Sequence, residues 1–393
     1  MTTAIETKAP GIHLLETKTP GPIAGAGTST AALIGKVEKE GVTPDKPVLV
    51  TNWTQYTQNF GELQGLSLPH ALRGFFRNGG NLAYVVPVDD ASGTDGITGA
   101  LDALTRVPDV SIVCVPGVTD TAKQKEVIEH CEVMGDRFAI LDGPRVPGPT
   151  DEPTDEPTPP SNPLEAVKAQ QPALTTERGF GALYWPWIVT DDPEAAAGEA
   201  ATLPVAPSGH IAGVMARSDN ERGVHKAPAN EVVRGALALQ YNLNDKEQSV
   251  LNNLGINALR TFPGGPPVVW GARTLTTQTP WRYVNVRRLV AYISDSLLQG
   301  LHWAVFEPNN TALWKALERT VIEFLTRVWQ AGALFGRTAA EAFYVKIDDE
   351  LNPEPVRALG QVFIEIGLAP TRPAEHVVVR LGLWSGGGSA QEA

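Results

Sequence analysis

Short apolar runs recur along the first two thirds of the chain, and amphipathic stretches separate them. Compact apolar runs of this length are typical of strands that are buried on both faces. They lie at residues 31–37, 47–50, 82–88, 110–115 and 137–144. Helical stretches lie between them, for example at 97–106 and 120–132. This alternation predicts an open α/β sheet covered by helices, in an outer α/β domain at residues 31–266.

Two long amphipathic helices set the last third of the chain apart. The first is predicted at residues 285–299, with one apolar face and a stop at Gly300. The second is predicted at residues 311–334, where Thr311 is the expected N-cap. Their buried stripes are predicted to consist of Val286, Leu289, Val290, Ile293 and Leu297 on the first helix, and of Leu313, Leu317, Val321, Leu325 and Val328 on the second.

Short alternating segments accompany these helices. Residues 301–308 are strand-like, and residues 343–347 and 362–366 alternate between apolar and polar positions. The apolar positions that share a face are Phe343, Val345 and Ile347 in one segment and Val362, Ile364 and Ile366 in the other. Together with the helices they predict an α+β domain at residues 267–384, made of two long helices and a small sheet.

Each end of the chain carries an apolar segment with no obvious partner nearby. Ile12–Thr17 is predicted to be a strand in an N-terminal arm at residues 1–30. Residues 18–30 are so rich in glycine, proline and small side chains that they are expected to pack little and to form a flexible connector. A second isolated strand is predicted at 376–384, before a flexible tail at 385–393. Such strands can extend a small sheet whose edge is open.

An acidic, proline-rich insertion interrupts the outer domain at residues 147–163 and contains the repeated sequence "TDEPTDEP". Proline at this density blocks both helix and sheet hydrogen bonding, and the acidic side chains repel one another. The segment is therefore predicted to be a disordered, solvated surface insertion.

Composition and charge narrow the class of protein. The chain has 393 residues, of which 42% are hydrophobic and 19% charged, so it is expected to be globular with more than one domain. All of the net charge of −12 falls before residue 267, which argues against a nucleic-acid partner. Cys114 and Cys131 are expected to be buried thiols in a reducing compartment, and no apolar run is long enough to span a bilayer.

Candidate chemistry is sparse. The seven histidines, at positions 13, 70, 130, 210, 225, 302 and 376, have no spacing typical of a zinc site. The stretch "GPIAGAGTST" lacks the Gly-Lys-Ser/Thr ending of a phosphate loop. Residues 217–230 are dense in polar groups that could build an enzyme site, although a structured loop is the favoured interpretation. Those groups are Asp219, Asn220, Arg222, His225 and Lys226. We therefore expect no catalytic, cofactor-binding or metal-binding residues.

The sequence also resembles a known family over nearly its whole length. Residues 270–336, "AEAFYVKID" and the closing "NPEPVRALGQVFIEIGLAPTRPAEHVVVRLGLW" are similar to the C-terminal domain of phage tail sheath proteins. Upstream, "PGIHLLE", "PVLVTNWTQYTQNFGEL" and "LRGFFRNGGNLAYVVPV" resemble the N-terminal half of the same family. The single-chain architecture looks most like the sheaths of extracellular contractile injection systems and R-type tailocins.

This resemblance implies a structural role and a set of partners. The subunit would polymerise around an inner tube in a metastable extended state and then contract, driving the tube through a target envelope. The implied partners are copies of itself in a helical homo-oligomer of stacked rings, an inner tube protein, and baseplate and terminal cap proteins. No cofactor, nucleic acid or membrane insertion is implied. Assembly is expected in the cytoplasm, and the particle could later be released from the cell. Two alternative functions stay open, namely an α/β enzyme and an inner tube protein.

The resemblance also implies which residues meet other subunits. Arm strands would leave their own subunit and add to the small sheet of a neighbour. The implied strand-exchange residues are Ile12, His13, Leu14, Leu15, Val377, Val378, Val379 and Leu381 in the arms, and Phe343, Val345 and Ile364 in the receiving sheet. The candidates for contact with the tube are Lys315, Arg319 and Arg327, with Arg287 and Arg288 as a second choice. The latter pair is predicted to form a solvated or partner-facing helix edge.

Overall fold

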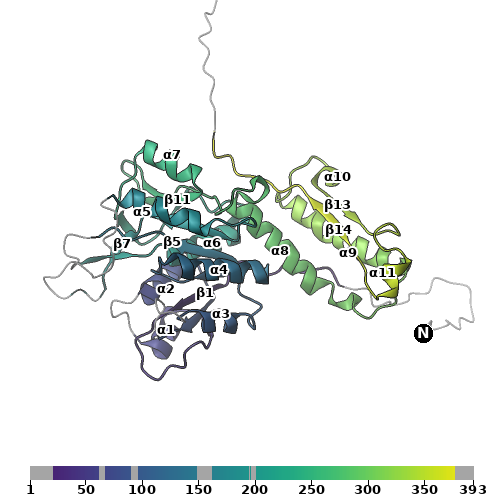
Figure 1. Ribbon diagram of the computed structural model, residues 1–393, viewed down its shortest axis with the longest axis horizontal. Coiled ribbons are helices and arrows are strands. Elements are labelled where there is room, and N and C mark those ends of the chain that lie inside the picture. The colour runs from purple at the N-terminus through teal and green to yellow at the C-terminus, as the bar shows by residue number, and fades with distance from the viewer. Residues whose placement is uncertain are drawn as a thin grey trace, which may run out of the picture.

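The computed structural model describes residues 21–61, 67–89, 96–147, 162–193, 195 and 201–376. They form a broad α/β body and a slimmer C-terminal domain beside it, joined by the long helix α8 (Figure 1). The predicted arm strands, nearly all of the acidic insertion and the C-terminal tail lie outside the described residues.

A nine-stranded sheet forms the centre of the α/β body. Its order is β2-β3-β1-β4-β5-β6-β11-β12-β9. The six strands from β3 to β11 run parallel, and antiparallel strands complete both edges. The strands are β1 Ala31–Gly35, β2 Val48–Val50, β3 Ala83–Pro87, β4 Ile112–Cys114, β5 Phe138–Asp142, β6 Gly181–Trp185, β9 Glu231–Val232, β11 Ile256–Thr261 and β12 Pro267–Val269. The predicted α/β sheet is confirmed, and it includes β12, which lies beyond residue 266.

Helices cover both faces of this sheet, and each face has its own apolar core. Alternate residues of β1 serve the two cores, with Leu33 in one and Ile34 in the other. The first core is covered by α1 Trp53–Phe60, α2 Ser67–Arg77 and α6 Ser208–Arg222. The second is covered by α3 Thr98–Leu104, α4 Thr121–Met134, α5 Pro163–Gln170 and α7 Asp245–Asn253. Burial on both faces explains why these strands appear in the sequence as continuous apolar runs.

A small antiparallel sheet of order β10-β7-β8 adjoins the body. It consists of β7 Ile188–Asp191, β8 Thr202–Val205 and β10 Ala236–Leu239. Asp191 at the end of β7 accepts hydrogen bonds from Arg73 at 2.9 Å and from Arg77 at 2.6 Å. These two bonds fasten the small sheet to α2.

The C-terminal domain consists of two long helices and a two-stranded sheet, as predicted. Its elements are α8 Val284–Gly300, α9 Thr311–Gln330, α10 Ala339–Ala342, α11 Glu354–Ala358, β13 Phe343–Lys346 and β14 Glu365–Leu368. On α9 the whole predicted apolar stripe is buried. The N-cap of α9 is Asn310, whose side chain accepts from the amides of Ala312 and Leu313, so Thr311 is already the first helical residue.

Two local predictions in this region are wrong. Residues 301–308 are not a strand: His302–Ala304 form one turn of 3-10 helix, because the segment reverses the chain between α8 and α9 and no strand of the described chain lies beside it. The polar stretch 217–230 is not all loop, since its first residues are the last turns of α6, which ends at Gly223.

The largest correction concerns residues 18–30, which were predicted to form a flexible connector. From Gly21 onward the chain lies along α8 and α9 instead of standing free (Figure 1). Ile23 is 3% exposed and contacts α8 at Gly300. Gly25 passes so close to Tyr292 that a Cβ on it would lie 2.4 Å from the tyrosine oxygen. The small residues that suggested flexibility are thus what permits close packing.

Candidate assembly interface

The small sheet of the C-terminal domain has unpaired edges in the described part of the chain. β13 and β14 pair antiparallel, with Val345 opposite Ile366, and no other strand joins them among the described residues. Two-stranded sheets are marginal alone, and an open edge presents unpaired backbone donors and acceptors. Phe343 is buried against α9, whereas Tyr344 is 53% exposed. A further strand could therefore add to this sheet.

The segment that precedes the predicted C-terminal strand is clamped to the central body. Glu375 accepts from Arg273 Nε at 2.9 Å and Nη2 at 2.6 Å, and from the Tyr283 hydroxyl at 3.2 Å. Burial raises the pKa of Glu375 and these hydrogen bonds lower it, with a net lowering. The chain is thus held just before residue 377, beside the start of α8.

The segment that follows the predicted N-terminal strand is held at several points along α8 and α9. The Arg327 guanidinium donates to the Ile23 carbonyl at 2.6 Å, and the Ala26 amide donates to Ser296 Oγ at 2.9 Å. Farther on, Arg288 donates to the Thr28 carbonyl at 2.8 Å. The segment therefore runs from the C-terminal end of α8 to its N-terminal end. The two arms leave the described chain at opposite ends of this helix, roughly 25 Å apart at 1.5 Å per residue.

The arginine pair on α8 is buried, so the prediction of a solvated edge is wrong. Arg288 is 4% exposed and forms two hydrogen bonds, of 2.6 and 3.0 Å, with the Asp219 carboxylate. Arg287 lies 4.2 Å from the ring centroids of both Phe180 and Trp281, and burial lowers its pKa to about 10. Within the subunit, neither side chain offers an exposed edge for a tube.

By contrast, the outer face of α9 is exposed and charged. Lys315 pairs with Glu318 at 2.7 Å, and Arg327 pairs with Glu323 at 3.1 Å. Arg319 is exposed and has no ion-pair partner in the described part of the chain. This face is thus a mixed row of charges in which Arg319 alone is uncompensated.

The polar stretch at 217–230 is largely occupied by internal contacts. Arg217 donates to the carbonyls of Asn78 at 2.9 Å and Val232 at 2.7 Å. Lys226 donates to the carbonyl of Ala229 at 3.0 Å, and Asp219 is bound to Arg288. Burial, with Arg222 nearby, lowers the pKa of His225. Across the described residues, no group of three or more His, Cys, Asp or Glu side chains could hold a metal ion.

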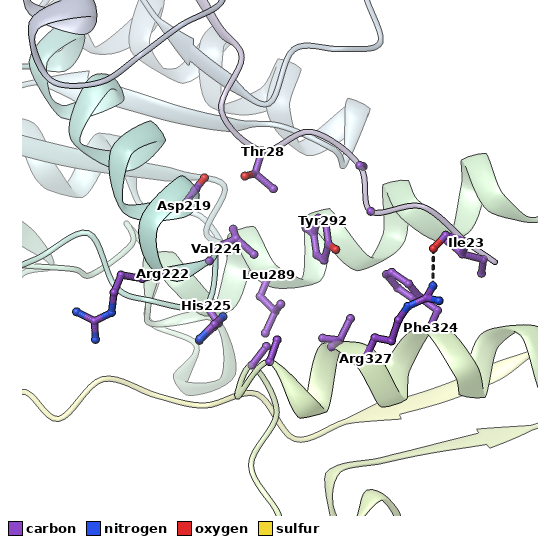
Figure 2. A pocket seen from close by; sticks show the side chains of 16 residues that line it. Ile23, Thr28, Asp219, Arg222, Val224, His225, Leu289, Tyr292, Phe324 and Arg327 are labelled. Atoms are coloured by element: carbon purple, nitrogen blue, oxygen red, sulfur yellow. Dashed lines mark hydrogen bonds between the residues drawn. The ribbon is translucent and has the colours of Figure 1, made fainter.

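A pocket of about 350 Å³ lies where the connector, the end of α6 and helices α8 and α9 meet (Figure 2). Thr28, Leu289 and Tyr292 line one side, and Phe324 and Arg327 line the other. Its wall is mixed apolar and polar, without a convergent set of catalytic groups. It marks the junction of the two domains.

Sequence reasoning missed two contacts that hold the junction together. Asp219 and Arg288 are 69 positions apart, and Arg273 and Glu375 are 102 apart. The sequence carries no local signal for either pair, because the partners are close only in space. In the described residues no helix has the length and apolarity to cross a bilayer.

Comparison with known proteins covers both domains. The family model for the phage tail sheath protein central domain matches residues 90–275, and the model for the phage tail sheath C-terminal domain matches residues 276–383. A protein named as a prophage major tail sheath protein from Pseudomonas aeruginosa (strain UCBPP-PA14) is 27% identical over 175 residues, which is 43% of each chain. The tail sheath protein of Escherichia phage P2 is 21% identical over 174 residues, 43% of this chain and 42% of that one. The alignments thus span less than half of these curated relatives.

Solved structures extend the likeness to almost the full length. The chain is 27% identical to a subunit of the sheath complex of the PVC extracellular contractile injection system in its contracted state, with a TM-score of 0.76 over 97% of this chain and 99% of that one. The helical sheath of the anti-feeding prophage in its contracted state is also 27% identical, with a TM-score of 0.75 over 96% and 99% of the two chains.

These relatives are sheath proteins and not enzymes, which agrees with the prediction of a structural role. The predicted family is confirmed by matches to both of its domains. Because the two models meet without a gap and together match residues 90–383, the chain belongs to the phage tail sheath protein family.

Proposed function

We propose that this chain is the sheath subunit of a contractile injection system of the extracellular type. It polymerises into stacked rings around an inner tube and shortens on triggering to drive the tube outward. The observation that carries this proposal is the full-length likeness to sheath subunits solved in a contracted state. Baseplate assemblies of the anti-feeding prophage also contain a chain that is 26% identical to this one, which supports a baseplate as a partner.

Strand exchange is the proposed link between subunits. Ile12, His13, Leu14 and Leu15 from one neighbour, and Val377, Val378, Val379 and Leu381 from another, add to the small sheet. Of the predicted receiving residues, Phe343 and Val345 lie on β13, whereas Ile364 directly precedes β14 and is not part of the strand as predicted. The two-stranded sheet supports this, because it has open edges and is too small to be stable alone. The anchored segments at Gly21 and Glu375 direct the arms away from opposite ends of α8.

The anchors change where rotation can occur. Residues 23–30 are fixed to their own subunit, so this part of the predicted connector does not act as a swivel for the N-terminal arm. The buried Arg288–Asp219 pair also joins α8 to α6, so the two domains are expected to move as one rigid body. Contraction then consists of rigid subunits turning about short links.

Contact with the tube is proposed for the outer face of α9, at Lys315, Arg319 and Arg327. Exposed ion pairs contribute only about 0–1 kcal/mol each, so one subunit holds the tube weakly while many hold it firmly. The exposure of Lys315 and Arg319 supports this face, whereas the burial of Arg287 and Arg288 argues against the alternative. The acidic α/β body and its insertion then face outward, and a terminal cap completes the particle, which is assembled in the cytoplasm.

The proposal is tested by electron microscopy of particles made from the chain co-expressed with its neighbouring genes. We expect helical sheaths around a tube, in long narrow and short wide forms. A chain that is folded yet forms no helical polymer with its tube and baseplate proteins present would contradict the proposed function.

The tube contact has its own test. Reversal of Lys315 and Arg319 to glutamate should leave folding unchanged, because both side chains point into solvent. It should yield sheaths that are empty or already contracted. The matched control is reversal of the exposed Lys125 and Arg106 on the α/β body. An unchanged fraction of tube-filled extended particles would remove this face as the tube contact.

A further inference from the structure

An aromatic side chain stands fully in solvent at the turn after α8. Phe306 is 102% exposed, and its backbone has a φ of +68°. Left-handed backbone is unfavourable for a bulky residue that is not glycine, and such positions tend to mark functional sites. No packing contact among the described residues accounts for a phenylalanine here.

Phe306 is part of a larger apolar surface built from two loops and the end of α8, which we call the Phe306 patch. Val305, 58% exposed, precedes Phe306 in the chain, and Leu298, 69% exposed, lies near the C-terminal end of α8. The loop after α11 contributes Leu359, 75% exposed, and Phe363, 51% exposed.

Polar and apolar contacts hold these two loops side by side. Asn309 Nδ2 donates to the Gln361 carbonyl at 2.9 Å, and Asn309 Oδ1 accepts from Trp314 Nε1 at 2.9 Å. Trp303 and Val362 pack against one small core beneath. Figure 1 places α11 and the C-terminal end of α8 at the same end of the molecule. The patch is therefore a fixed surface on a built support.

We propose that the Phe306 patch is a docking surface for a second copy of this chain, in a subunit-to-subunit contact separate from strand exchange. This inference rests on the proposed function. Its occupant is argued from where the N-terminal arm leaves the subunit. Ile23 contacts Gly300 at the same end of α8, so the 20 residues before Gly21 depart beside the patch. A second copy seated on the patch would lie beside the point where that arm leaves the subunit and within its reach.

The chemistry of the patch also favours a second copy over the tube. Residues 301–306, "LHWAVF", carry no formal charge, whereas the outer face of α9 carries several. A tube that must slide free suits weak charged contacts, which exchange readily with water. A contact between subunits that stay joined suits apolar burial, which is worth at least about tenfold in affinity for one large side chain. Exposed apolar patches on a soluble subunit commonly mark such interfaces.

The test is Phe306→Asn in the full chain, because asparagine tolerates the left-handed backbone while it removes the ring. Val133→Gln is the matched control, since Val133 is 85% exposed on α4 of the other domain. Polymer formation is measured by sedimentation and negative-stain microscopy over a range of protein concentrations, with and without the tube protein. Thermal unfolding of the unassembled subunit verifies that each variant is folded.

We expect Phe306→Asn to raise the protein concentration needed for polymerisation at least about tenfold in both conditions, and Val133→Gln to leave it unchanged. Polymerisation of Phe306→Asn at the wild-type concentration would overturn the inference, as would normal tube-free polymers that merely fail to hold a tube. If the wild-type chain polymerised in neither condition, the proposed function would fail and this inference with it.

A second readout identifies the occupant directly. A benzophenone amino acid in place of Phe306 is irradiated in assembled particles, and the product is sized under denaturing conditions. A covalent pair of two sheath chains supports the inference. A product with the tube protein, or an internal link to residues 1–20 of the same chain, overturns it.

Discussion

The α/β body and the C-terminal domain of this subunit differ in how completely each satisfies its own backbone and apolar surface. The body encloses a nine-stranded sheet between two layers of helices, and strands such as β1, β4 and β5 are buried throughout. Among the described residues, the C-terminal domain has a sheet of two strands with open edges. Although it is much the shorter of the two, it exposes about as many large apolar side chains as the body, namely Leu298, Val305, Phe306, Ile322, Phe335, Tyr344, Leu359 and Phe363.

This difference indicates that the body is structurally complete within one chain, whereas the C-terminal domain is not. A closed α/β body can reach its stable structure within one chain. A domain with open strand edges and exposed apolar surface becomes complete only when other chains cover it. Changes in the body should therefore act on the folding of one subunit, and changes at the ends of the C-terminal domain should act on assembly.

Deletion of residues 1–20 is expected to have the largest effect, and that effect should fall on assembly and not on folding. We expect a folded subunit of normal thermal stability, because residues 21–30 retain their contacts with Ser296, Arg327 and Arg288. Sheath assembly should be abolished, since the small sheet of each neighbour loses its added strand. Negative-stain microscopy and circular dichroism measure the two properties. Full-length tubes formed by the truncated chain would show that the arm is not the link.

Loss of the buried ion pair between the domains should have the second-largest effect, a decrease in the free energy of unfolding. Arg288→Met leaves the Asp219 carboxylate buried without its partner, which typically costs about 3–5 kcal/mol. The double variant Arg288→Met with Asp219→Asn should recover much of this loss, because no buried charge remains. Urea unfolding gives the free energies. Equal losses in the single and the double variant would mean that Arg288 acts through its bond to the Thr28 carbonyl instead.

The clamp on the C-terminal arm should give a smaller and local effect. Arg273→Gln removes both charged hydrogen bonds to Glu375, each worth about 1.5–3 kcal/mol when buried and less at this half-buried site. We expect cleavage by a glutamate-specific protease after Glu375 to speed up about tenfold. Arg282→Gln is the control, because Arg282 forms no ion pair in the described chain. Equal cleavage rates in the two variants would exclude the clamp.

The sequence predicted those parts of the subunit that depend on local pattern. Apolar runs marked the strands of the body, and 3.6-residue periodicity marked α8 and α9, including the stripe from Leu313 to Val328. It mispredicted residues 21–30, because a glycine-rich segment looks flexible unless the groove that fits it is known, and that groove is formed by Tyr292 and Gly300 far along the chain. It misjudged Arg288 for the same reason, since its partner Asp219 is close only in space.

The candidate interface was predictable only in outline. Open strand edges followed from two short alternating segments with no third partner, and the arm residues rested on family resemblance. The Phe306 patch was missed because the short apolar run in "LHWAVFEP" was interpreted as a strand. Only the fold shows that this segment is a turn in solvent, with Leu359 and Phe363 beside it.

The last prediction concerns how the stability of the α/β body depends on pH, where two buried groups oppose each other. Burial raises the pKa of Asp142 to about 6, despite hydrogen bonds from Gly117 and Ser208. Burial, with Arg77 nearby, lowers the pKa of His210 to about 3. Below pH 6.5 the unfolded chain protonates His210 while the folded chain does not, so folding stability falls by about 1.4 kcal/mol per pH unit.

Between about pH 6 and 4 the folded chain instead protonates Asp142 before the unfolded chain does, so this group adds stability at the same rate as the pH falls. The slopes of these two groups oppose each other in the wild type, while His130, whose pKa burial and Arg137 lower to about 4, adds a second slope of the same sign as that of His210. Asp142→Asn should remove only the compensating slope, so its stability relative to wild type should decline by about 1.4 kcal/mol per unit as the pH falls from 6 to 4. The exposed Asp109→Asn serves as the control. Urea unfolding, followed by tryptophan fluorescence, measures the difference. A constant difference between Asp142→Asn and wild type across this range would mean that Asp142 keeps an ordinary pKa in the folded chain.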